Sequence, residues 1–420
     1  MSDAILYIPG LNNRIAYAVA EALDRRSGIY PKITQDESEY LASDMSLKIH
    51  YTQRDLPGYR LYRSGFLDET GIKQGFVPSF AHVNNVFCLF VDAQQQEFDL
   101  LAMVFWCLTR YEEYQPFTPD KHGRFPAAAS WLKKWNVLEE PICDLAIQAT
   151  LKTWGLTPKP KFTVTPTLDI DIAFAYAGRT FLRSLGSTLK NPLSLPQRLK
   201  SIAHPESDAN YSFPYIQSAL QNHPEARVFW HCGADNNPYD KQVSLDYLPL
   251  LQAMKNMDNG TRCGLHPSFA ACTDSTILLK EKQFLEQTLN RQITDSRMHY
   301  ILLSFPRTYR SLLHVGITHD YSMGYPDANG FRAGTAYPFH WYDLEAEKAT
   351  QLQIHPFCMM EATCKYYAAQ TPEQAMDTGL RLKAAVQNTG GDFGFIFHNE
   401  SLGSQAGWRG WKKVFEAWIA

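Results

Sequence analysis

The sequence has no long apolar run, no cluster of Lys and Arg, and no internal repeat. No stretch approaches the roughly 18 apolar residues of a transmembrane helix, so no membrane span is expected. A net charge of −3 and a pI of about 6.5 argue against nucleic acid or anionic lipid as an obligate partner. The first residues lack the basic segment of a signal peptide. We therefore expect a cytoplasmic protein.

The eight cysteines form no CxxC pair and no regular spacing, and they stand in mostly apolar contexts. Such cysteines are typical of buried free thiols, not of a disulfide framework or a zinc site. The sequence therefore predicts free thiols in a reducing compartment.

The composition, with 45% hydrophobic and 20% charged residues over 420 positions, predicts a globular chain of two or three domains. Residues 1–155 predict an N-terminal α+β domain, and LTPKPK at 156–161 is typical of a linker. From residue 160 to 420, predicted strands and helices alternate, which favours a parallel sheet, open or closed into a barrel. The expected elements before the linker are strands 4–8, 47–51 and 86–91 and helices 14–26, 93–111 and 140–154. The expected strands after it begin with TLDID and continue at 226–232, 262–266, 297–303, 316–320, 351–358 and 393–398.

Asp and His residues follow many of these predicted strands, and the carboxyl ends of parallel strands meet at one edge of a sheet. The residues at these ends are Asp169, Asp171, His231, Asp235, His266, Asp320, His398 and Glu400. This concentration predicts a catalytic or metal site at that edge.

Asp169 and Asp171 end the apolar stretch TVTPTLDID, and residues i and i+2 of a strand point to the same face. Repulsion between the two carboxylates would raise one pKa unless a cation lies beside them. A divalent metal held by one acid would leave the other as a general base. The alternative is a hydrated loop boundary, where Asp is common.

Three further residue groups have both a functional and a plain structural interpretation. His266 and His398 follow apolar residues and suit a metal ligand and a general acid, although a packed core or turn histidine fits equally. Arg297 and His299 would share one strand face, where Arg could hold a catalytic carboxylate ionised; a surface ion pair and a packed ring are the alternative.

Two segments rich in aromatic and charged residues complete the candidates. The expected loop 321–343, with the preceding Asp320, offers Arg332, Tyr337, glycines and aromatics that suit a sugar ring, or simply a packed loop. The segment RYEEYQPFTPDKHGRF at 110–125 predicts helix-end ion pairs, or docking onto the second domain.

These motifs, in this order, resemble those of NodB-like polysaccharide deacetylases (carbohydrate esterase family four) over roughly residues 160–400. TLDID resembles the first family motif, which implies Asp169 as catalytic base and Asp171 as metal ligand. CGLHPSFA resembles the second motif and supplies His266, but Ala270 stands where the family has a second histidine.

The later motifs extend the resemblance. Arg297 matches the arginine that contacts the catalytic base, Asp320 lies where the fourth motif would fall, and FIFHNES places His398 as the general acid. With the second histidine absent, the third metal donor must be another residue, and His299 or His231 is the candidate. The acids are also spaced D-x-D, whereas the family's are adjacent.

The resemblance implies a distorted (β/α) barrel, Zn²⁺ or another divalent metal, and removal of an N-acetyl group from a sugar or glycan intermediate in bacterial surface polysaccharide metabolism. For a cytoplasmic chain, a nucleotide-linked or lipid-linked sugar fits best. Residues 1–155, through RYEEY and HGRF, resemble an uncharacterised domain that precedes such deacetylase domains in bacteria. The alternative is a catalytically silent glycan-binding protein on the same fold.

Overall fold

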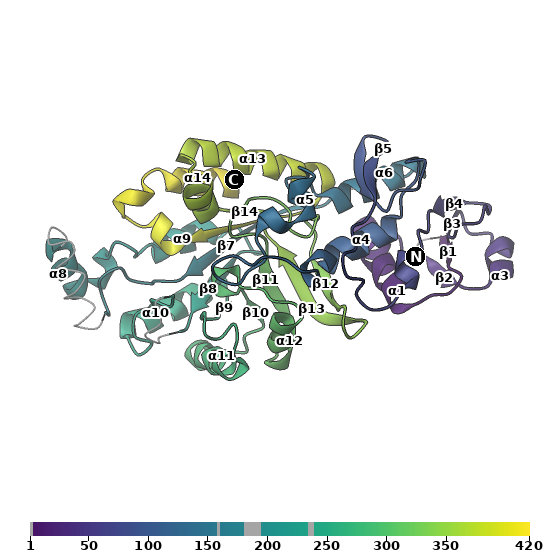
Figure 1. The fold of residues 1–420 in the computed structure, drawn as a ribbon. Helices are drawn as coiled ribbons and strands as arrows, with labels where there is room; N and C mark the ends of the chain where they lie inside the picture. The colour runs from purple at the N-terminus through teal and green to yellow at the C-terminus, as the bar shows by residue number, and fades with distance from the viewer. Residues whose placement is uncertain (1–2, 158–159, 180–194, 234–238) are drawn as a thin grey trace.

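The structure is a computed structural model that describes residues 3–157, 160–179, 195–233 and 239–420 (Figure 1). Asp235 therefore lies outside the described residues. The N-terminal region holds a four-stranded parallel sheet in the order β2-β1-β3-β4 and a β5–β6 hairpin. Its strands are β1 (Ala4–Tyr7), β2 (Lys32–Thr34), β3 (Leu47–Tyr51), β4 (Tyr59–Leu61), β5 (Phe80–Val83) and β6 (Val86–Leu89). Its α-helices are α1 (Asn13–Val19), α2 (Arg25–Ser27), α3 (Glu37–Ala42), α4 (Leu100–Leu108), α5 (Trp131–Lys134) and α6 (Ile142–Thr153).

A nine-stranded sheet follows, in the order β12-β13-β11-β10-β9-β8-β7-β15-β14. Every pairing is parallel except β12 with β13. This curled, mostly parallel sheet confirms the predicted fold class, a distorted (β/α) barrel with a smaller N-terminal domain. Its strands are β7 (Phe162–Ile170), β8 (Arg227–His231), β9 (Arg262–His266), β10 (Asp295–Ser296), β11 (His319–Met323), β12 (Phe339–Asp343), β13 (Lys348–Pro356), β14 (Met359–Met360) and β15 (Gly391–His398).

Helices cover this sheet, with α13 and α14 on one side in Figure 1 and α10, α11 and α12 on the other. Their ends follow ordinary capping chemistry: Asp274 caps α11 through the backbone N–H of Thr276, and Thr371 caps α13 in a capping box. The helices after β7 are α8 (Leu195–Ala203), α9 (Phe213–Leu220), α10 (Leu248–Asp258), α11 (Ser275–Leu289), α12 (Arg307–His314), α13 (Pro372–Thr389) and α14 (Trp411–Ile419).

One hydrophobic core runs through both regions. All nine residues of α4 are buried, because the helix lies inside this core and has no solvent-facing side. Tyr17 of α1 donates to the carbonyl of His340 on β12, over 2.6 Å. The two regions therefore pack as neighbours, and the boundary between 1–155 and 160–420 stays a prediction.

Several predicted elements were wrong in extent. Residues 297–303, all of which the structure describes, do not form the expected strand. β10 ends at Ser296, and Tyr300 and Ile301 take left-handed φ values of 58° and 54°, which a strand does not allow. The expected helix 93–111 shortens to α4, because Asp99 caps its first turn and Arg110 is left-handed after its end. The expected loop 321–343 contains the end of β11 and all of β12.

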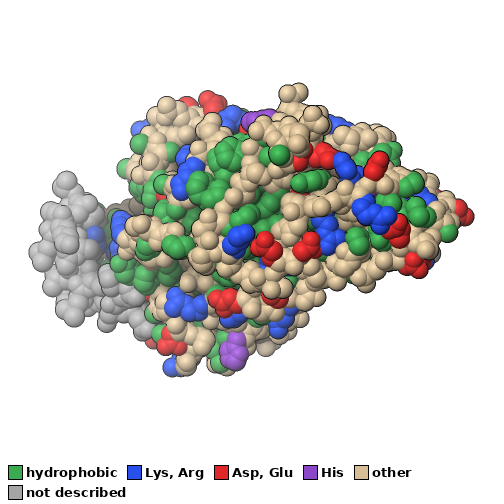
Figure 2. Space-filling view, turned by 45° about the vertical axis from the view of Figure 1, so that its right-hand side comes forward, with side chains coloured by type: hydrophobic (Ala, Val, Ile, Leu, Met, Phe, Trp, Pro, Cys, Tyr) green, Lys and Arg blue, Asp and Glu red, His purple; other side chains and the backbone are tan. Residues whose placement is uncertain are grey.

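The eight cysteines are buried and free, as predicted. Among the described residues, the helices are all too short or too polar to cross a membrane. On the face drawn in Figure 2, Lys and Arg side chains are interspersed with Asp and Glu.

Candidate metal centre

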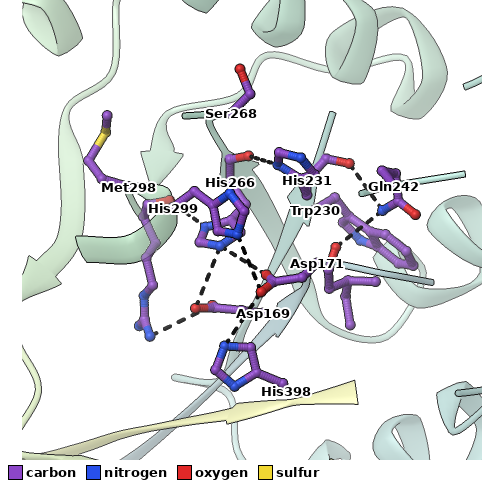
Figure 3. A network of polar contacts seen from close by, with 12 residues as sticks. Asp169, Asp171, Trp230, His231, Gln242, His266, Ser268, Met298, His299 and His398 are labelled. Atoms are coloured by element: carbon purple, nitrogen blue, oxygen red, sulfur yellow. Dashed lines mark hydrogen bonds and ion pairs between the residues drawn. The ribbon is translucent and has the colours of Figure 1, made fainter. Parts of the chain in front are cut away.

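The predicted acids and histidines meet at the carboxyl edge of the large sheet (Figure 3). Asp169 lies at the end of β7, beside His398 of β15 in the strand register, and Asp171 follows β7. His266 ends β9, and His299 comes shortly after β10. Parallel strands in register thus place residues that are far apart in sequence at one point.

Three of these side chains have the spacing of metal ligands. Nε2 of His266 lies 3.1 Å from Oδ1 of Asp171, and Nε2 of His299 lies 3.4 Å from Oδ2 of the same residue. One ligand atom from each of the three lies within 4.8 Å of the others. Oδ1 of Asp171 is buried and accepts no hydrogen bond from any described residue. This donor set, one carboxylate and two imidazoles around an unsatisfied oxygen, fits Zn²⁺ or a similar divalent cation.

Both imidazoles are oriented by oxygen atoms behind them. Nδ1 of His266 donates to the carbonyl of Arg297 over 2.6 Å, and Nδ1 of His299 donates to Oδ1 of Asp240 over 3.1 Å. These acceptors hold the Nδ1 side of each ring, so that Nε2, which faces Asp171, is the nitrogen available to a metal. The pair of rings therefore points two ligand nitrogens at one carboxylate.

His231, the other donor considered from the sequence, contacts Asp240 and the backbone of His266 instead of Asp171. Its Nδ1 donates to the carbonyl of His266 over 3.2 Å, and its Nε2 lies 3.4 Å from Oδ1 of Asp240. His231, Asp240 and His299 also form a group with metal-like spacing. Since Oδ1 of Asp240 already accepts from His299, we interpret this inner group as support for the His299 ring.

Arg297 lies next to Asp169. Its guanidinium is completely buried, with one nitrogen 3.7 Å from Oδ1 of Asp169 and another donating to Oγ1 of Thr167 over 2.6 Å. The rings of Phe229 and Phe357 lie 4.9 and 5.5 Å from it. Burial between these rings lowers the pKa of Arg297, although nearby Asp169 opposes this shift.

His398 is paired with Glu361, a residue that the sequence analysis missed. Nδ1 of His398 donates to Oε1 of Glu361 over 2.8 Å, and its Nε2 faces Oδ2 of Asp171 at 3.8 Å. Burial lowers the pKa of His398, but the charges of Glu361 and Asp171 outweigh burial and hold that pKa well above its usual value. A histidine kept protonated in this way can serve as a proton donor.

The same charges act on the candidate ligands. Burial raises the pKa of Asp171, but His299 and His398 outweigh it and hold the pKa well below the ordinary range. Burial lowers the pKa of His299, whereas Asp171 and Asp240 raise it, to about 9. Burial, with His299 and His266, lowers the pKa of His231 to about 3. The centre thus combines a stabilised carboxylate with cationic and neutral imidazoles.

A cavity of about 220 Å³ opens above the cluster. Asp169, Asp171, His266, His299 and His398 line its polar side. Its other walls are mainly aromatic or apolar and include Met298, Tyr300, Ile301, Met360, Tyr366, Tyr367 and Trp408. Tyr366 and Tyr367 are 62% and 50% exposed, so aromatic faces are available at the opening.

The three residues predicted to contact substrate do not line this cavity. Asp320 is completely buried behind Arg297, where its carboxylate accepts from Ser322 and Ser296, and burial raises its pKa to about 6. Arg332 forms a buried ion pair with Glu113. Tyr337 lines a different pocket, beside Arg26 and Asp144. Packing and ion pairing of the loop account for the positions of Arg332 and Tyr337.

The sequence analysis also missed Asp240 and Arg124 as site residues. Asp240 belongs to no helix or strand, so no periodic pattern in the sequence joins it to His299. Arg124 belongs to the HGRF segment, which was marked for its density of charge but assigned to helix ends or docking; it lines the cavity.

Comparison with known proteins is informative for the N-terminal region. A protein family of unknown function (DUF7033) matches residues 4–154. No curated protein matches the chain.

Solved structures similar to this chain align over about three fifths of it. One, from Mycobacterium smegmatis and described as a polysaccharide deacetylase, is 13% identical, with 62% of this chain and 83% of that chain covered at a TM-score of 0.39. A second, the PuuE allantoinase, is 10% identical, with 62% and 83% covered at 0.38. A third, a mutant of a carbohydrate esterase family four pseudoenzyme with restored activity, is 12% identical, with 61% and 63% covered at 0.27. At these scores the alignments assign no chemistry, and the proposed function rests on the site.

Proposed function

We propose that the protein is a metal-dependent hydrolase that removes an N-acetyl group from a sugar or glycan intermediate, in the metabolism of bacterial surface polysaccharides. The observation that supports this most is the pair of oriented imidazoles, His266 and His299, whose Nε2 atoms face Asp171. His299 takes the place of the histidine that is absent at position 270. Zn²⁺ or another divalent metal held by these three residues would polarise the amide carbonyl and acidify a water molecule.

The remaining residues have separate tasks in this proposal. Asp169, beside the metal ligands and 3.7 Å from Arg297, takes the proton of the attacking water, and the guanidinium holds this carboxylate in position. His398, held protonated by Glu361, gives a proton to the departing amine. The aromatic walls at Tyr366, Tyr367 and Trp408 receive the sugar ring. Positioned proton transfer of this kind contributes about 10²–10⁴ in rate.

The test combines metal analysis with an assay of acetate release. We expect the purified protein to bind close to one Zn²⁺ per chain and to release acetate from one or more members of a panel of N-acetylated sugars and oligosaccharides. Asp169→Asn should abolish turnover and retain the metal, whereas His266→Ala should lose both. His314→Ala, which changes an exposed histidine on α12, is the matched control and should behave as wild type.

Two other outcomes separate the alternatives. A protein that binds glycan but no metal, and whose melting temperature does not change when metal is added, would be the silent glycan-binding protein. A protein that binds metal and hydrolyses other amides or esters, without acetate release from sugars, would contradict the proposed substrate.

A further inference from the structure

A tight turn of the N-terminal region, Asp120–Phe125, lies against the cavity of the proposed metal centre. Asp120 organises this turn, because its Oδ1 accepts from the backbone N–H groups of His122 and Arg124 over 2.8 and 3.0 Å. Gly123 takes a φ of +80°, as the turn requires. The other carboxylate oxygen of Asp120 accepts from Nε of Arg124 over 2.8 Å. Contacts within the turn itself therefore orient the guanidinium of Arg124 toward the barrel.

From this position Arg124 bridges two segments that both line the cavity. One terminal nitrogen donates to the backbone carbonyl of Tyr300 over 2.7 Å, and the other donates to the hydroxyl of Tyr367 over 3.3 Å. Tyr300 follows β10, and Tyr367 lies after β14. Arg124 is only 3% exposed, so its guanidinium is largely shielded from water.

The segment held at Tyr300 contains a metal-ligand candidate. Tyr300 directly follows His299, and their rings lie 4.5 Å apart. Tyr300 and Ile301 have left-handed φ values, which residues with large side chains rarely adopt without support from their surroundings. That support includes the bond from Arg124 and the ring of His122, which packs 5.2 Å from the ring of Tyr300.

Attachment of the N-terminal region does not depend on Arg124. Arg332 pairs with Glu113 in the buried core, and Arg381 of α13 pairs with Glu139 at the surface. The charge of Arg124 is also matched by Asp120, so an anionic ligand is not needed to neutralise it. Neither attachment nor anion binding explains why its donors point at the two walls of the cavity.

We infer that the Asp120–Phe125 turn is part of the active site, and that Arg124 is a positioning residue that holds the His299 segment and the Tyr367 wall in place. This inference rests on the proposed function, since it gives the N-terminal region a task in metal binding. The N-terminal region is then a component of the metal centre, and a separated barrel would bind metal weakly.

The test uses the full chain and two measurements on Arg124→Ala. In the metal-free protein, we expect the backbone amides of residues 298–303 to lose protection from hydrogen exchange. We also expect Co²⁺ affinity, measured by its visible absorption, to fall about tenfold, in the range seen when support behind metal ligands is removed. Arg381→Ala is the matched control, because it removes another ion pair between the two regions that lies away from the cavity, and it should change neither measurement.

Arg124→Lys keeps the charge and one donor group and should recover part of the affinity. If Arg124→Ala does not fold, the same two measurements on Arg124→Lys decide. Exchange or Co²⁺ affinity equal to the control's in a folded Arg124→Ala overturns the inference. A wild-type protein that binds no Co²⁺ instead contradicts the proposed function, and exchange at 298–303 still decides whether Arg124 holds the segment.

Discussion

Replacing Asp240 tests how strongly the buried carboxylate behind His299 supports the proposed metal site. Asp240 is 2% exposed, and its Oδ1 accepts from both His299 Nδ1 at 3.1 Å and the backbone N–H of Phe269 at 3.0 Å. Asp240→Asn keeps an accepting oxygen and loses only the charge, so Zn²⁺ affinity should fall about tenfold, or about 1.4 kcal/mol. Asp240→Ala removes the acceptor and leaves the ring free to turn, so affinity should fall about 100-fold.

The measurement is a competition titration of the metal-free protein against a chromophoric zinc chelator at neutral pH. Asp246→Asn, which removes an exposed carboxylate nearby in the sequence, is the control and should bind as wild type. The order of the two losses of affinity matters as much as their magnitudes, because a purely electrostatic effect would make Asp240→Asn and Asp240→Ala equally weak. Wild-type affinity in Asp240→Ala would refute the reasoning.

Three further changes test stability and proton transfer. Burial raises the pKa of Asp392 to about 6, so the native protein loses stability as pH rises from about 4 to 6. Asp392→Asn avoids this loss, so its free energy of unfolding should exceed that of wild type by up to about 3 kcal/mol at pH 8 but by little at pH 4. Denaturant melts at both pH values measure this difference. Glu113→Ala leaves the buried guanidinium of Arg332 without a carboxylate partner, while Arg110 keeps Glu112, and should cost about 3–5 kcal/mol of unfolding free energy. Glu139→Ala, at an exposed pair, should cost under about 1 kcal/mol. Glu361→Gln removes the charge that raises the pKa of His398, so the alkaline limb of the kcat profile should move to lower pH. An unmoved limb would argue against His398 as the acid.

Much of the barrel could be predicted from the sequence because its strands are apolar and end in polar residues. FTVTPTLDI and RVFWH each became a strand of the large sheet. RMHYILL has the same apolar character, yet it turns sharply at Tyr300, where distant residues such as Arg124 hold a left-handed backbone. A local pattern contains no information about such contacts.

The candidate site, too, could be predicted only in part from the sequence. Asp169, Asp171, His266 and His398 could be placed together because each ends or follows a strand, and parallel strands share one carboxyl edge. Asp240 and Glu361 could not, because they lie outside any periodic segment and act through another residue. The glycines and aromatics around Arg332 predict a substrate contact, but Arg332 pairs with Glu113, and a partner 219 positions away cannot be read from the local sequence.

The proposed ligands stand at positions 171, 266 and 299, so no two of them lie on one strand or one helical turn. A histidine pair four residues apart can chelate a metal even in an unfolded chain, whereas these donors meet only after three strands have assembled. Metal would therefore bind the native state almost exclusively, and free metal at 1,000 times the Kd would add about 4 kcal/mol of stability. In the cell, the lifetime of this chain against proteolysis would then follow the supply of metal.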